Sequence, residues 1–443
     1  MIPITTPEEM RRVDEAAPEP VEVLIDRAGG ALARAAVDML GGTYGRRVVV
    51  VAGPGNNGAD GRAAARRLRA RGVRVVEIDA LATPAVLPQA DLIIDAAFGT
   101  SLNRDYQAPA TGAVPVLAAD IPSGIDGLSG AELGRAVRAQ RTVTFQALKP
   151  GLLLGAGRVA AGRVEVADIG LDVSEVAAHR VETADVAAWV PERAAEAHKW
   201  QSACWVIGGS PGMTGAAHLA ARGALRAGSG YVRLSTPGGA GHDQAPTEAV
   251  QLALAADGWG DGLDGDRIAA AVIGPGLGRS HGDDVDAALG ALACPVVLDG
   301  DGLTSVSPSA IGGRTAPTVL TPHDGEFRML TGAMPPSDRF AAARELATST
   351  GAVVLLKGPL TLVAEPGGRV LATTAGDQRL ATAGSGDVLA GVIGALLARG
   401  ATAFHAAAAG AHVHGLAARR GRRVGLVAGD LPDLVADTLS RVT

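Results

Sequence analysis

The residues with the clearest chemical potential lie in the segment Ala381–Gly391, with the sequence ATAGSGDVLAG. Its small residues Gly384, Ser385 and Gly386 precede Asp387 and an apolar stretch that is predicted to be helical. Backbone N–H groups at such a helix start can neutralise the charge on a transferring phosphoryl group. Asp387, in the first turn, could take the proton from a hydroxyl that attacks the phosphorus. An isolated Gly-Asp pair could also serve only to stabilise the helix start. The surrounding loops are therefore needed to distinguish this role from phosphoryl transfer.

Five further loops follow predicted strands and could line the same crevice, because the carboxyl ends of parallel strands meet at one edge of a sheet. None of them contains the GxxxxGK[ST] sequence of a P-loop, so a nucleotide would be held in another way. Together with the glycine turn they favour phosphoryl transfer over a simple helix cap. The loops are GGSPGMTGAA (208–217), IGPGLG (273–278), LDGDGL (298–303), LTPHDGE (320–326) and LKGPLT (356–361).

A second candidate site begins where the apolar run 48–52 leads into GPGNNGADG (53–61) and a predicted helix. The glycine spacing is that of a dinucleotide-binding turn, and Glu77 and Asp79 end the next strand where such a fold keeps its ribose-binding acid. A dehydrogenase is therefore one alternative. A tight strand–helix turn without a ligand is another.

Three more segments place chemistry-bearing residues at predicted strand ends. They are DAAFGTSLNR (95–104), DIPSGID (120–126) and TFQALKPG (144–151). Asp95 or Asp120 alone could be a helix cap, but acids at successive strand ends favour a shared site.

These four N-terminal segments resemble the NAD(P)H-hydrate epimerase domain over residues 5–185. The resemblance implies that Asp120 contacts the reacting end of a damaged dinucleotide and transfers a proton, with Lys149 as a second candidate. It also implies a potassium ion bound by Asn57, Asp95 and Ser123. The residues implied to bind the substrate are Asn56, Asn57, Gly58, Ala59, Asp60, Gly99, Thr100, Ser101, Leu102, Asn103, Arg104 and Asp120.

The chain departs from the epimerase pattern at Ala59 and Ser101, where the family usually has glycine, and its N-terminal helical region contains Pro18 and Pro20. Either side chain would be strained if the backbone there needed a positive φ. A domain that binds a partner without turnover is therefore the alternative.

The C-terminal motifs resemble the ribokinase-like superfamily, and within it the NAD(P)H-hydrate dehydratase family, over residues 195–440. The chain departs from that family at 200–203 and 376–379. The resemblance implies that ADP, accompanied by Mg²⁺, phosphorylates the hydrate. The implied substrate contacts are Ala216, Gly276, His323 and Asp387, and the implied adenine-nucleotide contacts are Lys357, Gly358, Pro359, Leu360, Thr361 and Gly386.

The elements that must position these residues alternate between short apolar strands and helices, which is typical of parallel sheets covered on both faces. We therefore predict an α/β protein of two domains: a Rossmann-like domain over 1–190 and a ribokinase-like domain over 191–443. The predicted strands are 48–51, 73–78, 92–95, 114–119, 142–145, 204–207, 231–235, 272–273, 296–298 and 353–356, and the predicted helices are 59–70, 214–227, 338–348 and 388–399.

Composition narrows the function classes. A net charge of −6 argues against a general nucleic-acid binder. Two cysteines, Cys204 and Cys294, form no disulfide framework, and no apolar run is long enough to span a membrane, so a cytoplasmic protein is expected. His405, His412 and His414 lie in an alanine-rich stretch without evident metal partners and are expected to be packed or solvated.

Taken together, the sequence predicts repair of hydrated NADH and NADPH (NADHX and NADPHX): epimerisation of the R and S hydrates by the first domain and ADP-dependent dehydration of the S hydrate by the second. A homo-oligomer is expected. The alternative is a ribokinase-like vitamin or sugar kinase with a non-catalytic N-terminal binding domain, which would keep Gly386 and Asp387 but release a stable phosphoester.

Overall fold

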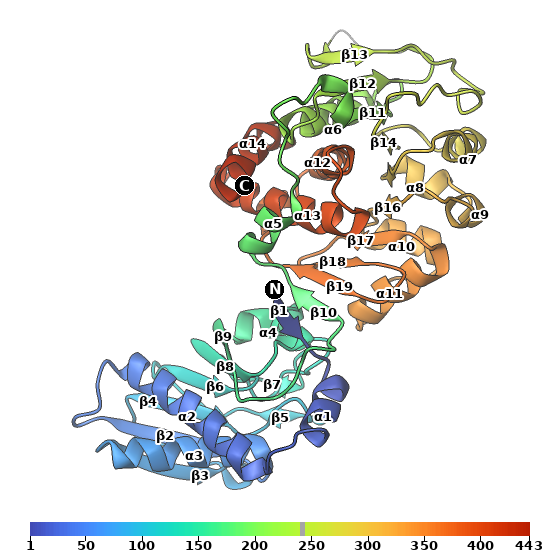
Figure 1. Cartoon of the computed structure of the whole chain (residues 1–443). Coiled ribbons are helices and arrows are strands. Elements are labelled where there is room, and N and C mark those ends of the chain that lie inside the picture. Colours follow the sequence, from blue (N-terminus) through green and yellow to red (C-terminus); the bar gives the residue numbers. More distant parts are fainter. Residues whose placement is uncertain (240–243) are drawn as a thin grey trace. The chain divides into compact units, whose positions relative to one another are not determined.

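The computed structural model describes residues 1–239 and 244–443 (Figure 1). It divides into two compact units, one formed by Ile2–Ala178 and the other by Met1 with His179–Thr443. The sequence placed this division at 190/191. It lies earlier because Val181, directly after strand β10 (Ala178–Arg180), donates its backbone N–H to Ala372, and because helix α5 (Thr183–Trp189) packs on helices of the C-terminal unit.

The N-terminal unit is built on a six-stranded parallel sheet with the order β3-β2-β4-β6-β8-β9. The apolar runs of β2 and β4 are buried, as expected for inner strands of a parallel sheet. β3 lies on one side of β2 in the sheet, and β4 lies on the other. The strand order therefore reverses between β2 and β4, which is the topological switch point of the sheet. The strands are β2 (Arg47–Ala52), β3 (Arg74–Asp79), β4 (Leu92–Ala96), β6 (Val116–Ala119), β8 (Arg141–Phe145) and β9 (Arg163–Ala167).

The three longest helices of this unit lie on one face of the sheet. On that face α1 (Pro7–Glu15), α2 (Val21–Leu40) and α3 (Asn56–Ala70) share a core with the strands. Leu102, in a loop, and Tyr106, in a short strand, belong to a second core on the other face. The predicted coverage of both faces is thus confirmed. Short elements complete the unit: β1 (Ile2–Ile4), β5 (Tyr106–Gln107), β7 (Gly134–Arg135) and α4 (Gly155–Ala160).

The sheet of the C-terminal unit has the order β10-β19-β18-β17-β16-β15-β14-β11-β12-β13, parallel from β17 to β13, with β18 antiparallel to both neighbours. Pairing of Ile207 with Ile273 and of Ile273 with Leu298 aligns the strand ends, so that their loops emerge at one edge. The strands are β11 (Ala203–Ile207), β12 (Tyr231–Ser235), β13 (Ala249–Gln251), β14 (Ala270–Ile273), β15 (Val296–Leu298), β16 (Thr318–Leu320), β17 (Val353–Leu356), β18 (Thr361–Ala364) and β19 (Val370–Thr373).

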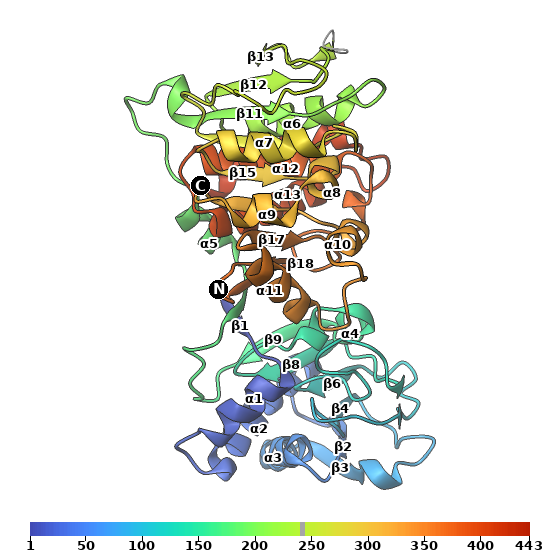
Figure 2. The same cartoon turned by 90° about the vertical axis from the view of Figure 1, so that its right-hand side faces the viewer.

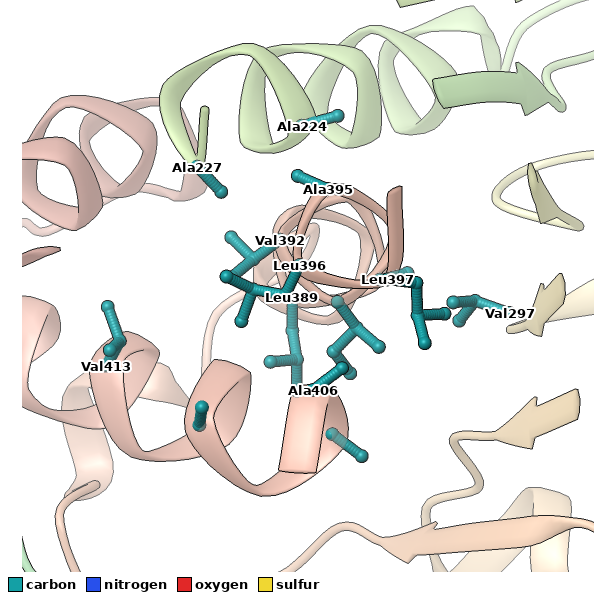
Figure 3. Close-up of a cluster of buried hydrophobic side chains, with 14 of the residues drawn as sticks. Ala224, Ala227, Val297, Leu389, Val392, Ala395, Leu396, Leu397, Ala406 and Val413 are labelled. Atoms are coloured by element: carbon teal, nitrogen blue, oxygen red, sulfur yellow. The ribbon is translucent and has the colours of Figure 1, made fainter. Parts of the chain in front are cut away.

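Two layers of helices enclose this sheet (Figures 1 and 2). One face carries α6 (Thr214–Arg226), α12 (Ser385–Ala398), α13 (Ala403–Arg420) and α14 (Leu431–Val442). Alanine, valine and leucine side chains of α6, α12 and α13 form part of this core in Figure 3. Close approach of α6 and α12 requires Gly391, because a Cβ there would lie 1.9 Å from the Ala220 carbonyl oxygen. The other face carries α7 (Gly282–Ala291), α8 (Asp301–Ser305), α9 (Pro308–Gly312), α10 (Asp324–Thr331) and α11 (Arg339–Thr350).

Two helices begin three residues earlier than the sequence predicted. α3 begins at Asn56 and α12 at Ser385, each directly after a glycine at the N-cap. The motif residues Asn56–Asp60 and Ser385–Asp387 therefore lie in the first turns of helices, with their amides at the N-terminal end. Within the described ranges, no helix is both long and apolar enough to cross a membrane.

Candidate active sites

The N-terminal unit has a cleft of about 780 Å³ at the carboxyl ends of its strands. It opens at the switch point between β2 and β4, the usual ligand position in a doubly wound sheet. Helix α1, which the sequence did not assign to the site, forms part of its wall through Glu8, Arg11 and Asp14. Of the residues expected to bind substrate, those lining the cleft are Asn56, Asn57, Asp60, Gly99, Thr100, Ser101 and Asp120.

A buried ion pair lies in this cleft. The Nζ atom of Lys149 is 2.6 Å from Oδ1 of Asp120, and it also donates to the Thr144 hydroxyl and to the carbonyl of Phe145. Thr144 in turn donates to Asp120. Asp120 has a positive φ of 63°, which is rare for a residue with a side chain and marks local strain. The strand ends thus bring together the two residues proposed for proton transfer.

Two further carboxyl groups near this pair hold protons more tightly than usual. Burial, and then the charges of Asp120 and Asp14, raise the pKa of Asp60 to about 8. Burial also raises the pKa of Asp14. A neutral Asp60 at pH 7 can donate a hydrogen bond to a substrate, whereas an ionised one could only accept. Asp14 was missed because nothing in the pattern PEEMRRVDE indicates which helical face meets the cleft.

Of the three residues expected to bind potassium, Asp95 and Ser123 contact each other, and Asn57 lines the cleft. Asp95 accepts hydrogen bonds from the backbone N–H and the hydroxyl of Ser123, and burial raises its pKa to about 6. The amide oxygen and nitrogen of the half-buried Asn57 are themselves buried, and neither has a hydrogen-bond partner among the described residues. An unpaired buried amide is costly, so its oxygen is available to a ligand. Carboxylate, hydroxyl and amide oxygens suit a hard cation.

Other residues that were predicted to bind substrate do not line the cleft. Leu102 belongs to the buried core on the loop-covered face, and Arg104 lies over the Phe98 ring. Gly58 is required by a close approach, since a Cβ there would lie 1.9 Å from the Gly53 carbonyl oxygen. Neither Ala59 nor Ser101 has a positive φ, so both side chains are tolerated by the backbone.

Glu77 and Asp79, the acids expected to bind a ribose in a dehydrogenase, contact other groups of the protein. Glu77 pairs with Arg69, and Asp79 accepts a hydrogen bond from the backbone of Leu81. Neither acid lines the cleft that contains Asp120.

The C-terminal site is centred on Lys357 at the end of β17. Its Nζ atom is 2.5 Å from Oδ1 of Asp299, at the end of β15, and 3.9 Å from Oε2 of Glu326. Thr321 donates its hydroxyl to Asp299, which completes a buried polar network. Burial alone would lower the pKa of Lys357, but the nearby carboxylates raise it above its usual value. Asp299 and Glu326 were quoted within sequence motifs but not assigned a role, because only the fold brings them to the lysine.

The glycine turn faces this network. A Cβ on Gly386 would lie 3.2 Å from Nζ of Lys357 and 3.9 Å from Oδ2 of Asp299, so the turn and this ion pair approach each other closely. Gly384 has a φ of 89°, and this left-handed conformation starts α12. Burial, followed by the charge of Asp299, raises the pKa of Asp387 to about 7. Asp387 can therefore exchange a proton near neutral pH, as a general base must.

The remaining predicted contacts occupy neighbouring loops. A Cβ on Gly276, whose φ is 63°, would lie 2.9 Å from that of Ala216, so these two residues are adjacent. His323 caps α10: its Nδ1 atom accepts from the backbone N–H groups of Gly325 and Glu326, while the rest of the ring remains exposed. Leu360, in contrast, is completely buried.

The histidines of α13 behave as structural groups. His405 stacks on Trp189, and His412 bonds to Thr183 and Thr373. His414 is buried. Within the described ranges, no cluster of three or more His, Cys, Asp or Glu residues could hold a metal ion.

Comparison with known proteins identifies both halves. Residues 204–441 match the family model for NAD(P)H-hydrate dehydratase, and residues 21–88 and 77–151 match that for the YjeF-related protein N-terminus. The solved ADP/ATP-dependent NAD(P)H-hydrate dehydratase from Bacillus subtilis, co-crystallised with ATP and Mg²⁺, is 32% identical. It superposes with a TM-score of 0.53 and covers 59% of this chain and 98% of its own. The C-terminal unit therefore has the fold of that dehydratase, which is ribokinase-like.

Full-length relatives extend the match to both units. The bifunctional NAD(P)H-hydrate repair enzyme Nnr of Mycobacterium tuberculosis is 40% identical over 401 residues, which cover 83% of this chain and 82% of that protein. Nnr of Salinibacter ruber is 36% identical over 504 residues, covering 94% and 91%. The chain belongs to the family of bifunctional NAD(P)H-hydrate repair enzymes, as the motif resemblance predicted.

Proposed function

We propose that this chain restores hydrated NADH and NADPH in two steps, epimerisation in the N-terminal unit and nucleotide-dependent dehydration in the C-terminal unit. The observation that carries the proposal is Asp387, a carboxyl group with a pKa of about 7 in the first turn of α12, beside the Lys357–Asp299 pair. A vitamin or sugar kinase would use a similar turn, but it would leave the N-terminal cleft without a purpose.

In the dehydratase site, Asp387 takes the proton from the hydroxyl of the S hydrate as that oxygen attacks the terminal phosphorus of the nucleotide. Lys357 and the amides of the Gly384–Gly386 turn stabilise the negative charge on the transferring group. AMP leaves as the phosphoryl group is transferred. The ring nitrogen then supplies electrons as phosphate leaves, which gives an iminium ion, and loss of a proton from the adjacent ring carbon restores the reduced ring. Phosphorylation is needed because hydroxide is a poor leaving group. Ala216, Gly276 and His323 would contact the hydrate, and Lys357, Gly358, Pro359, Leu360, Thr361 and Gly386 the nucleotide.

In the epimerase site, Asp120 exchanges the proton at the reacting end of the dinucleotide, and Lys149 holds Asp120 in place. Asp60, neutral at pH 7, donates a hydrogen bond to the same ligand. The first turn of α3 presents backbone N–H groups that suit the pyrophosphate. This arrangement needs no help from the dehydratase site, so the two activities should be separable by mutation.

Two cations fit the residues present. Potassium would be held by Asn57, Asp95 and Ser123, where it would give the unpaired amide a partner. In the dehydratase site the carboxylates of Asp299, Glu326 and Asp387 outnumber the single amine of Lys357, so a divalent cation entering with the nucleotide would balance their charge. Mg²⁺ with ADP is the expected combination, because Mg²⁺ prefers carboxylate and phosphate oxygens.

The absence of a P-loop and the fused architecture favour ADP over ATP for this chain, and we further propose a cytoplasmic homo-oligomer. The test is direct: a mixture of NADHX epimers is incubated with equal concentrations of ADP or ATP, and the return of reduced-nicotinamide absorbance is followed. Complete conversion of both epimers faster than spontaneous epimerisation supports both activities. Conversion of the S half alone contradicts the epimerase assignment, and a clear advantage of ATP contradicts the choice of ADP.

A further inference from the structure

Two neighbouring strands of the N-terminal sheet, β6 and β8, end in the same unusual turn. In residues 119–121 and in residues 145–147, the third residue donates its backbone N–H to the carbonyl of the first, at 2.8 and 2.7 Å. The central residues, Asp120 and Gln146, have φ of 63° and 62°. A three-residue turn closed at positive φ is rare and strained for a residue with a side chain. Such a conformation persists only where the surrounding contacts enforce it.

Gln146 provides such contacts for the turn after β8. Its side-chain Oε1 atom accepts the backbone N–H groups of Ile169 and Leu171, at 3.0 and 3.2 Å, in the segment that follows β9. Its own backbone N–H donates to the carbonyl of Ala167, the last residue of β9. Ile169 and Leu171 are buried in the core that the sheet shares with its helices, so the anchor itself is held in place. These bonds fix the turn against the neighbouring strand.

The end of β8 presents two acceptors to the ammonium group of Lys149. The carbonyl of Phe145, the first residue of the turn, accepts from Nζ at 3.0 Å, and the Thr144 hydroxyl accepts at the same distance. The third contact of Nζ is Asp120, at 2.6 Å. An ammonium group has three N–H groups, so three acceptors match its capacity. Because the Lys149 side chain is only 2% exposed, these groups rather than solvent set the position of Nζ. The orientation of the Asp120 carboxylate therefore depends on the turn that Gln146 anchors.

We propose that Gln146 is a positioning residue of the epimerase site, which anchors the turn after β8 so that Lys149 holds the Asp120 carboxylate toward the reacting end of the dinucleotide. This role rests on the proposed function of the N-terminal unit. Gln146 does not line the cleft, whereas Lys149 and Asp120 do. Its loss should therefore reduce the rate of epimerisation more than the affinity for the hydrate, because a displaced catalytic group loses rate. A purely structural role would instead lower stability and leave turnover per folded molecule unchanged.

The experiment compares four variants of the full chain. Gln146→Ala removes the side-chain acceptor, Gln146→Gly removes it and also relieves the strain at positive φ, and Gln146→Glu keeps an oxygen acceptor on a side chain of the same length. Gln140→Ala is the matched control, because Gln140 precedes β8 at its opposite end and its side chain also accepts a backbone N–H, that of Val116. The measurements are kcat and KM for conversion of pure S hydrate to R hydrate without nucleotide, the thermal midpoint, and the rate of S-hydrate dehydration with ADP and Mg²⁺.

Gln146→Ala should lower kcat for epimerisation about 10–100-fold with little change in KM, while dehydration continues at the wild-type rate. Gln146→Gly should be more stable than Gln146→Ala, since glycine adopts a positive φ without strain, but similarly slow, since both lack the anchor. Gln146→Glu should recover most of the rate, and Gln140→Ala should retain wild-type kcat.

Wild-type kcat in folded Gln146→Ala would overturn the proposal, as would a rise in KM alone, an equal loss in Gln140→Ala, or no recovery in Gln146→Glu. If Gln146→Ala does not fold, Gln146→Gly tests the same loss of the anchor without the backbone strain. Absence of epimerisation by the wild-type chain would contradict the proposed function instead.

Discussion

Replacement of Asp387 by Asn should remove catalysis and stabilise the unliganded protein at the same time. The variant keeps the size of the side chain but cannot accept a proton. Loss of a general base typically costs about 10²–10⁴-fold in rate, so dehydration of S hydrate should fall by that order. Binding of ADP should survive, because the amides of the turn and Lys357 remain.

The stability effect follows from the raised pKa of Asp387. Its pKa of about 7, against a usual value of 3.8, means that the folded state binds the proton more tightly than the unfolded state. The free energy of unfolding therefore falls as the pH rises from about 4 to about 7 and is lowest above that range. At about 1.36 kcal/mol per pKa unit, the penalty above pH 7 is on the order of 4 kcal/mol. This exceeds the roughly 0.3–1 kcal/mol that an aspartate gives to a helix start.

The assay compares wild type and Asp387→Asn by calorimetry of the full chain without nucleotide at pH 5 and pH 8, together with S-hydrate turnover. The N-terminal unit, which the mutation does not touch, serves as an internal reference. The variant should unfold at a higher temperature than wild type at pH 8, and its advantage should shrink at pH 5. Near-wild-type turnover would remove Asp387 from the mechanism. Lower stability at pH 8 would show that Asp387 mainly stabilises the helix.

Three other predictions concern the remaining charged and polar groups. Asp120→Asn should reduce R-to-S epimerisation by about 10²-fold or more while leaving dehydration of pure S hydrate unchanged; equal loss of both activities would contradict separate sites. Lys357→Met should lower the free energy of unfolding by about 3–5 kcal/mol, because it leaves Asp299 buried without its partner. The double variant Lys357→Met with Asp299→Asn should recover part of that loss in denaturant titrations. No recovery would argue against a stabilising ion pair. Potassium, but not lithium, should raise the thermal midpoint of the N-terminal unit, and Asn57→Leu should abolish the difference; an unchanged difference would exclude Asn57 as a ligand.

Strand positions were well determined by local sequence. β12, β15 and β17 lie at the predicted residues, because short apolar β-branched runs bounded by glycine, proline and aspartate leave few alternatives. The boundary between the units was placed too late, because pairing after β10 depends on β19, almost 200 residues further along the chain. Local sequence contains no information on such a partner.

Local sequence also determined the chemistry available at each turn. A left-handed Gly384 followed by Ser, Gly and Asp at a helix start is a property of adjacent residues, as is the close turn from Gly53 to Gly58. Only the tertiary structure decided which groups face these turns and how strongly they hold protons. Asp14 comes from α1, whereas Asp299 follows β15 and Lys357 follows β17. A pKa depends on burial and on charges brought within a few ångströms, and folding alone sets both.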